Sequence, residues 1–131
     1  MARVLVDTSA IYALLDQGDA CHRKAKQHLV QLQKVRKEPI LTNFIVAECH
    51  ALLLSRLGRD FARAWLLSNV WFIERVNVED EQKARRILST YSDKNFSLTD
   101  ALSFSVMERL KIKQAFAFDQ HFRQYGFFLI E

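Results

Sequence analysis

The sequence predicts an α/β protein in which helices cover both faces of a parallel β-sheet. Short, continuous apolar runs such as residues 4–6 are typical of strands buried on both faces. Between these runs lie longer segments, such as 79–91, whose apolar residues recur at helical spacing. Because strands and helices alternate along the chain, we expect a three-layer α/β/α sandwich.

In the first half of the chain, we expect strands at residues 4–6 and 40–41. The expected helices cover residues 8–16, 19–35, 43–57 and 59–70. Gly18 follows the first helix, and Thr42 or Asn43 can cap the third. Gly58 is expected to end that third helix, because glycine readily adopts the backbone conformation found after helix ends.

In the second half, we expect strands at residues 71–76, 115–118 and 127–130. The expected helices cover residues 79–91 and 99–110, and a short one follows residue 118. Acids in the first turn of 79–91, with bases further along, suit the helix dipole. The helix at 99–110 is unusually apolar, so we expect it to be central.

The composition predicts one domain spanning residues 1–131. Half of the residues are hydrophobic, and only three glycines and one proline are present, which argues against disorder or a long linker. The formal net charge of +4 mildly favours an anionic partner. The two cysteines do not make a disulfide framework, and neither a secretory signal nor a membrane-spanning segment is evident. We therefore expect a cytoplasmic protein with no membrane contact.

Two acids directly follow predicted strands. Asp7 comes after the strand at residues 4–6, and Asp119 comes after the strand at residues 115–118. Ligands of open parallel sheets bind outside the carboxyl ends of the strands, which is where both acids would lie. Each could instead simply cap the helix that follows.

Two further acids lie in apolar helices. Glu48 stands within a helix so apolar that most of its circumference should be buried, and a buried carboxylate without a partner costs several kcal/mol. It therefore needs a base, a metal or one exposed edge of the helix, and nearby His50 favours such an edge. Asp100 lies in the first turn of the helix at 99–110, where capping by Ser97 or Thr99 is compatible with metal binding.

If these four carboxylates converge, their mutual repulsion requires a cation. Ligation by oxygen alone favours Mg²⁺ or Mn²⁺ over zinc. The hydroxyls of Thr8, Ser9 and Thr99 are close enough in sequence to hydrogen-bond the carboxylates or a metal-bound water. Such a site suits phosphate chemistry, in which one ion can activate a water and a second can stabilise the leaving oxygen.

Four segments, in order, resemble the motifs of the PIN-domain family, and most closely its VapC-type toxins and their stand-alone relatives. They are Val-Leu-Val-Asp-Thr-Ser-Ala at residues 4–10, Val-Ala-Glu at 46–48, Ser-Leu-Thr-Asp-Ala at 97–101 and Phe-Asp-Gln-His-Phe at 118–122. Each motif is weak alone, but together they cover essentially the whole chain.

The resemblance implies a flavodoxin-like sheet of four or five parallel strands and RNA endonuclease activity with Mg²⁺ or Mn²⁺. By motif, the metal-site acids would be Asp7, Glu48, Asp100 and Asp119, with Thr8 or Ser9 as the hydroxyl beside the first acid. It also implies homodimerisation and, for a toxin, an antitoxin partner. Ala117 departs from the family pattern, which has Thr or Ser two residues before the last acid. Asp93 stands where many relatives carry an acid, and we interpret it as a solvated loop residue.

Our hypothesis is that Asp7 and Asp100 bind the principal ion and that Glu48 completes or positions it. Asp119 would hold a bound water or a second ion. RNA needs basic contacts, for which Lys94, Arg85 and Arg86 are the candidates, Lys94 first because it lies near Asp100 in the sequence. The RNA substrate could be tRNA, rRNA or mRNA.

Two alternatives remain open. The first is a PIN scaffold that has lost catalysis and serves as a protein- or RNA-binding module, which Ala117 keeps possible. The second is a metal-dependent phosphatase, although Ser9 stands where its second acid should be. A zinc site is disfavoured, because the cysteines and histidines show neither Cys-x-x-Cys nor His-x-x-x-His spacing.

Overall fold

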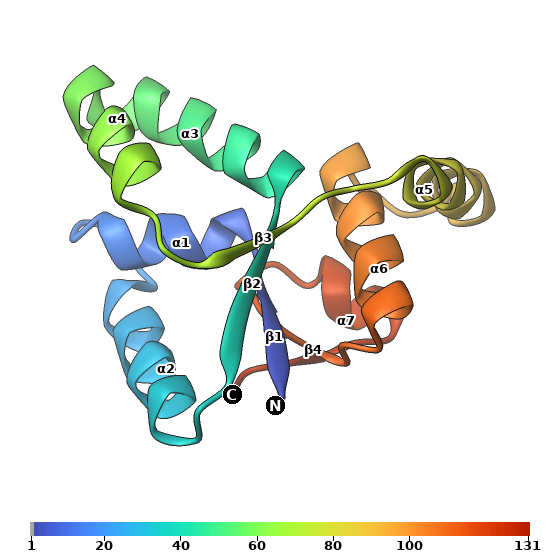
Figure 1. Cartoon of the computed structure of the whole chain (residues 1–131), viewed down its shortest axis with the longest axis horizontal. Helices are drawn as coiled ribbons and strands as arrows, with labels where there is room; N and C mark the ends of the chain where they lie inside the picture. The colour runs from blue at the N-terminus through green and yellow to red at the C-terminus, as the bar shows by residue number, and fades with distance from the viewer. Residues whose placement is uncertain (1) are drawn as a thin grey trace.

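The computed structural model describes residues 2–131 as an α/β sandwich around a five-stranded parallel sheet, as predicted (Figure 1). The strand order is β3-β2-β1-β4-β5. The strands are β1 (Arg3–Val6), β2 (Glu38–Thr42), β3 (Phe72–Glu74), β4 (Gln114–Phe116) and β5 (Phe128–Leu129). Strand β1 is central, and its Leu5 pairs with Ile40 of β2 on one side and Ala115 of β4 on the other.

Helices connect the strands and cover both faces of the sheet. They are α1 (Thr8–Leu15), α2 (His22–Lys34), α3 (Asn43–Leu57), α4 (Arg59–Ser68), α5 (Val78–Thr90), α6 (Leu98–Leu110) and α7 (His121–Tyr125). In Figure 1, α1 and α2 lie on one side of the sheet and α6 and α7 on the other. The α3–α4 pair extends from the end of β2, and α5 packs against α6.

The core explains the apolar runs of the sequence. Val4, Leu5 and Val6 of β1 are fully buried, because helices cover both faces of the central strand. In α6, every residue from 101 to 107 is buried, so this apolar helix is central, as expected. Phe104 stacks on Tyr125 and contacts Phe122 edge-on, so α6 and α7 pack through their aromatic rings.

The predicted ends of α3 are confirmed. Thr42 is the N-cap, and its hydroxyl accepts a hydrogen bond of 3.0 Å from the backbone N–H of Ile45. Gly58 ends the helix with a φ of +95°, a conformation that L-residues with a side chain rarely adopt. The following helix starts at once, which lets α3 and α4 pack against each other.

Several expectations about local structure are wrong. Helix α2 starts at His22 rather than residue 19, because the Asp19 side chain accepts a hydrogen bond from the Cys21 N–H in the preceding turn. The strand expected at 115–118 ends at Phe116, so Asp119 lies in a bend three residues beyond β4. Strands β3 and β5 are also shorter than expected. Among residues 2–131, no helix combines the length and apolarity needed to cross a membrane.

Candidate active site

A cavity of about 610 Å³ opens at the carboxyl ends of β1 and β4. All four acids predicted from the sequence line it: Asp7, Glu48, Asp100 and Asp119. They come from the start of α1, the middle of α3, the start of α6 and the bend before α7. The remaining lining residues are Thr8, Ser9, Ala51, Leu52, Ser55, Ser97 and His121. The fold therefore brings together carboxylates that lie more than 100 residues apart in the sequence.

Asp7 caps α1 and lines the cavity at the same time. Its Oδ2 accepts hydrogen bonds from the backbone N of Ser9 at 3.2 Å and from the Ser9 hydroxyl at 2.8 Å. That hydroxyl in turn accepts a hydrogen bond of 3.0 Å from the backbone N–H of Phe118. Ser9 thus ties Asp7 to the segment that leads to Asp119.

The electrostatic environment of Asp7 disfavours its ionised form. Burial raises the pKa of the Asp7 carboxyl well above its ordinary value, and the negative charge of Asp119 raises the pKa further. Only 4% of Asp7 is exposed, so water screens this repulsion poorly. A cation held between the two carboxylates would remove the repulsion and favour ionisation of both.

Glu48 is exposed to the cavity, contrary to the expectation that α3 buries most of its circumference. Helix α3 is fully buried only along the line of Ile45, Cys49 and Leu53, and Glu48 lies beside that line. Its Oε1 accepts a hydrogen bond of 2.6 Å from the Thr8 hydroxyl. Glu48 therefore lies on an exposed edge of α3, as one of the three expectations for it held, and this edge faces the other acids.

Cys49, next to Glu48, takes no part as a thiolate. Burial, together with the charges of Glu48 and Asp7, raises the pKa of its thiol to about 12. The thiol therefore stays protonated at neutral pH, which disfavours a zinc site that includes it. Cys21, the second cysteine, is half-buried and is not among the residues lining the cavity.

Asp100 is fixed by the start of α6. Its Oδ2 accepts a hydrogen bond of 3.0 Å from the backbone N–H of Ser97, and the Ser97 hydroxyl accepts one from the Asp100 N–H in return. This capping box confirms Ser97 as the N-cap. Only 6% of Asp100 is exposed, so its carboxylate is held at the wall of the cavity.

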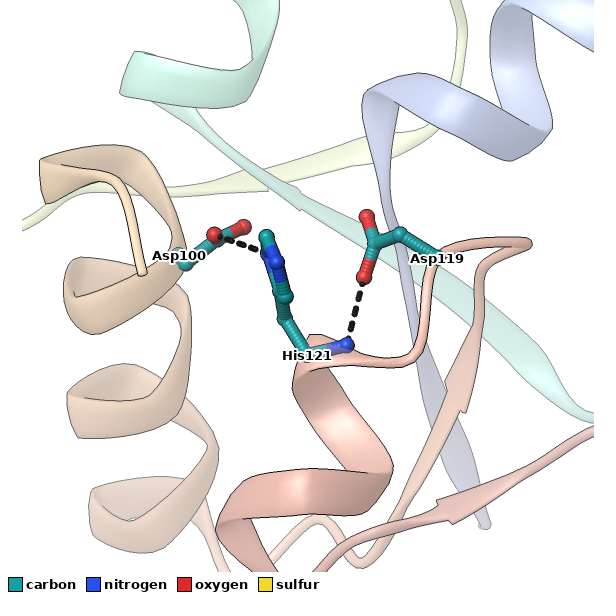
Figure 2. A group of neighbouring side chains, drawn as sticks. All are labelled: Asp100, Asp119 and His121. Carbon is teal, nitrogen blue, oxygen red and sulfur yellow. Dashed lines mark hydrogen bonds and ion pairs between the residues drawn. The ribbon is translucent and has the colours of Figure 1, made fainter. Parts of the chain in front are cut away.

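His121 joins Asp100 to Asp119 (Figure 2). Its Nδ1 lies 2.7 Å from Oδ2 of Asp100, and its backbone N–H donates a hydrogen bond of 3.0 Å to Oδ1 of Asp119. One possible ligand atom from each of these three residues lies within 4.8 Å of the others. The sequence pattern led us to consider the histidines only as possible zinc ligands, so the position of His121 beside the acids was missed. Its place two residues after Asp119, in the last motif, was the available signal.

Each of the four carboxylates has one oxygen fixed and one oxygen free. Asp7, Glu48, Asp100 and Asp119 each accept hydrogen bonds on a single oxygen. Among residues 2–131, no N–H or hydroxyl group donates to their second oxygens, and the Asp7 and Asp119 carboxyls lie within hydrogen-bonding reach of each other. Carboxylates that are oriented by neighbours but keep a free lone pair suit a divalent cation that binds oxygen. The donor set therefore fits a hard metal ion.

The other predicted residues lie outside the cavity. Thr99 is half-buried in the first turn of α6 and is not among the lining residues. Lys94 is exposed in the turn between α5 and α6, where its Nζ lies 3.5 Å from a carboxylate oxygen of Asp93. Arg85 and Arg86 are exposed on α5. All three bases are thus accessible to a ligand larger than the cavity.

Comparison with known proteins identifies the family. Residues 4–128 match the model of the PIN domain. The chain belongs to the PIN-domain family. The resemblance seen in the four motifs is thereby confirmed, and the match includes all four cavity acids.

Individual PIN proteins resemble the chain along nearly its whole length. The 23S rRNA-specific endonuclease VapC20 of Mycobacterium tuberculosis is 35% identical over 129 residues, which covers 95% of each chain. Ribonuclease VapC26 of the same organism is 23% identical over 123 residues, covering 91% of this chain and 89% of VapC26.

Solved structures agree with this assignment. The crystal structure of M. tuberculosis VapC20, described as a toxin that cleaves the sarcin–ricin loop, superposes with a TM-score of 0.84 at 34% identity, covering 95% of each chain. PAE2754 from Pyrobaculum aerophilum superposes with a TM-score of 0.65 at 21% identity, covering 98% of this chain and 84% of PAE2754. At that identity, the second likeness supports the fold alone.

Proposed function

We propose that this PIN-domain protein is a metal-dependent endoribonuclease that hydrolyses RNA phosphodiester bonds with Mg²⁺ or Mn²⁺. The observation that carries the proposal is the convergence of four carboxylates on one cavity, each with one oxygen fixed and one free. The names of VapC20 and VapC26, an endonuclease and a ribonuclease, support it. We also propose a cytoplasmic location, because the proposed RNA substrate is found there.

In this proposal, Asp7 and Asp100 bind the principal ion, Glu48 completes or positions it, and Asp119 holds a bound water or a second ion. The ion would supply an activated water and neutralise charge that develops on the phosphate. The chain itself orients the ligands, because Ser9 fixes Asp7 and Thr8 fixes Glu48 before any ion arrives. The open cavity admits a phosphodiester to the free oxygens.

VapC20 suggests which RNA to try first. Because that relative is named for 23S rRNA and its sarcin–ricin loop, we propose ribosomal RNA as the first substrate class for this chain. Purified protein would be incubated with Mn²⁺ and two labelled RNAs of similar length, a fragment containing the sarcin–ricin loop and a tRNA. Cleavage at one position in the ribosomal fragment, with tRNA intact, would support this assignment. Cleavage of tRNA alone would contradict ribosomal RNA as the substrate and indicate tRNA, and the protein would still be a nuclease.

Replacing Thr8 by valine is expected to reduce cleavage about 10- to 100-fold, the range for losing a group that orients a metal ligand. Valine has nearly the same shape as threonine, but it removes the 2.6 Å hydrogen bond to Glu48. Thr8→Ser keeps the hydroxyl and is the matched control, which should retain most activity. Rates measured with saturating Mn²⁺ test this, and equal rates for the two variants would contradict an orienting role.

Replacing Lys94 by alanine is expected to weaken RNA binding several-fold and to reduce the salt dependence of binding by about one charge. Within the described part of the chain, residues 2–131, the exposed ammonium of Lys94 is engaged only by the exposed Asp93, so it is available to a phosphate. Titrations of the RNA at several salt concentrations, with EDTA to prevent cleavage, measure this. Lys111→Ala, an exposed base at the far end of α6, is the control and should leave affinity and salt slope unchanged.

We also propose that the protein forms a homodimer and binds an antitoxin, as the motif resemblance implies; the description of VapC20 as a toxin supports the antitoxin. The supporting feature is apolar surface: Leu67, near the end of α4, and Val70, just after that helix, are 85% and 90% exposed. Beside them, an apolar cavity of about 370 Å³ includes Trp65 and Trp71 among its lining residues. Mass measurement by light scattering tests the dimer.

The non-catalytic alternative depends on Ala117, which lacks the hydroxyl expected near the last acid. Ala117 is buried, but Asp119 is still oriented, because the His121 backbone N–H donates to its Oδ1. The Ser9 hydroxyl also binds the N–H of Phe118, the residue before Asp119. These two bonds support a working site despite the substitution. Membership of the PIN-domain family disfavours the phosphatase alternative.

A further inference from the structure

We propose that His121, oriented by Asp100, supplies a nitrogen ligand to a second ion that it shares with Asp119, and that this ligand makes the site favour Mn²⁺ over Mg²⁺. The inference rests on the proposed function, since it concerns the same metal site. It departs from a site made of carboxylates alone, which is what the four motifs predicted.

The orientation of the His121 ring suits a metal ligand. In Figure 2, the ring of His121 stands between the carboxylates of Asp100 and Asp119. Its Nδ1 lies 2.7 Å from Oδ2 of Asp100, an acceptor, so the neutral ring carries its proton on Nδ1 and a lone pair on Nε2. Histidines that bind metals usually donate their other ring N–H to a carboxylate in this way, which fixes the tautomer and strengthens the ligand.

Three contacts hold His121 in place. The backbone N–H of His121 is bonded to Asp119, its Nδ1 is bonded to Asp100, and Phe96 packs edge-on against the ring at 5.6 Å between centroids. About 31% of the side chain remains exposed, and His121 lines the cavity. The imidazole is therefore ordered before an ion binds and still accessible to it.

The possible ligand atoms around His121 lie close together. Asp100, Asp119 and His121 can each place one ligand atom within 4.8 Å of the other two. Two ligands of one ion, each about 2.1 Å from it, are at most about 4.2 Å apart, so a small adjustment of the Asp119 and His121 side chains brings these two to a single ion. In addition, Asp119 keeps its Oδ2 for this ion, because its Oδ1 accepts the backbone N–H of His121, and Asp100 keeps its Oδ1 for the principal ion.

The chemical consequence is a change in ion preference. Mg²⁺ is coordinated by oxygen ligands and gives up its waters reluctantly, whereas Mn²⁺, although it binds nitrogen the least tightly of the first-row transition ions, is less demanding than Mg²⁺ and can accept one imidazole among carboxylates. We expect Mn²⁺ to bind the wild-type protein more tightly than Mg²⁺, and we expect His121→Asn to reduce that preference at least about tenfold. Asparagine is the informative replacement because its side-chain N–H can still donate to Asp100 while it lacks the ring nitrogen.

Electron spin-echo envelope modulation of Mn²⁺-loaded protein tests the proposal directly, since a coordinated imidazole produces ¹⁴N modulation. Wild type and the control His50→Asn should both show this modulation, and His121→Asn should lose it. Calorimetric titrations with Mn²⁺ and with Mg²⁺ on the same three proteins would measure the preference. Circular dichroism would verify that each variant is folded.

Loss of the modulation in His121→Asn alone, together with a reduced Mn²⁺ preference, is the expected result. Absence of ¹⁴N modulation in the wild type, or its persistence in His121→Asn, would overturn the inference. If either of these two contrary results occurred but the wild type still cleaved RNA with Mn²⁺, the proposed function would stand. A failure of the wild type to bind Mn²⁺ at all would overturn both the inference about His121 and the proposed function.

Discussion

Replacing Asp7 by asparagine is expected to lower the rate of RNA cleavage more than about 100-fold, beyond the range for residues that merely orient a metal ligand. Asparagine keeps the shape of the side chain and can still accept the hydrogen bonds from Ser9. It removes the negative charge that would bind the principal ion. Single-turnover cleavage by identically purified proteins measures the loss, and a rate within tenfold of the wild type would contradict the role of Asp7.

The same substitution is expected to stabilise the metal-free protein at neutral pH. Because the pKa of Asp7 is raised in the folded protein by burial and by Asp119, the fold loses stability as the pH rises from the ordinary pKa of aspartate through this raised value. Asparagine has no charge to bury and can donate a hydrogen bond towards Asp119.

Melting temperatures in EDTA test this prediction. At pH 7, Asp7→Asn should melt a few degrees above the wild type, whereas the difference should shrink near pH 4, where Asp7 is protonated. With Mn²⁺ present, the order should reverse, because only the wild type gains stability from binding the ion at this position. A variant that melts below the wild type in EDTA at pH 7 would show that Asp7 is a structural acid.

The second large effect is expected at Arg109, whose replacement by alanine should destabilise the protein by about 3 kcal/mol. Its Nε and one terminal nitrogen contact both carboxylate oxygens of Asp80 at 3.0 and 2.8 Å, and its other terminal nitrogen contacts Glu74 at 3.2 Å. Asp80 is only 3% exposed, so the variant leaves a buried carboxylate without its counter-charge. The contact joins α6, which carries Asp100, to α5 and β3.

The cost of the Arg109 substitution should depend on pH. Burial alone would raise the pKa of Asp80, but hydrogen bonds from Arg109 and from the Asn77 backbone outweigh it, so the net pKa lies below its usual value. The stability that Asp80 contributes is therefore present above the ordinary pKa of aspartate and is lost as the pH falls through the lowered one. The difference between Arg109→Ala and the wild type should accordingly narrow in acid.

Urea unfolding at pH 7 and pH 3 measures this difference. Arg123→Ala is the matched control, because Arg123 forms an ion pair with Glu131 in which both side chains are largely exposed. Exposed pairs contribute about 0–1 kcal/mol, so this variant should unfold near the wild-type midpoint at both pH values. If Arg109→Ala also did so, the buried pair would have no net role in stability.

Much of the fold follows from local sequence. The three apolar residues of β1 followed by Asp7 predict a buried strand that ends in a polar side chain, and the structure has both. Thr42 and Gly58 mark the ends of α3 because capping depends on residues at those positions alone. The parallel sheet follows from the alternation of such segments, since parallel strands need a crossover between them.

The details of the site depend on packing between distant segments, which local patterns do not contain. Glu48 was expected in a buried helix, but the way α3 packs leaves an open edge on which Glu48 and Ala51 line the cavity. The position of His121 depends on the bend after β4, where the Asp119 side chain binds the His121 backbone and turns the ring towards Asp100. A histidine two residues after an acid does not by itself predict this geometry.

The most direct test of the central claim is cleavage of an end-labelled 23S rRNA fragment by the wild-type protein, measured with Mn²⁺ and with excess EDTA. We expect cleavage at defined phosphodiesters with Mn²⁺, none with EDTA, and cleavage by Asp7→Asn with Mn²⁺ that is more than about 100-fold slower than by the wild type. Cleavage that persists in EDTA, or that Asp7→Asn performs as well as the wild type, would contradict a metal-dependent nuclease built on these four carboxylates.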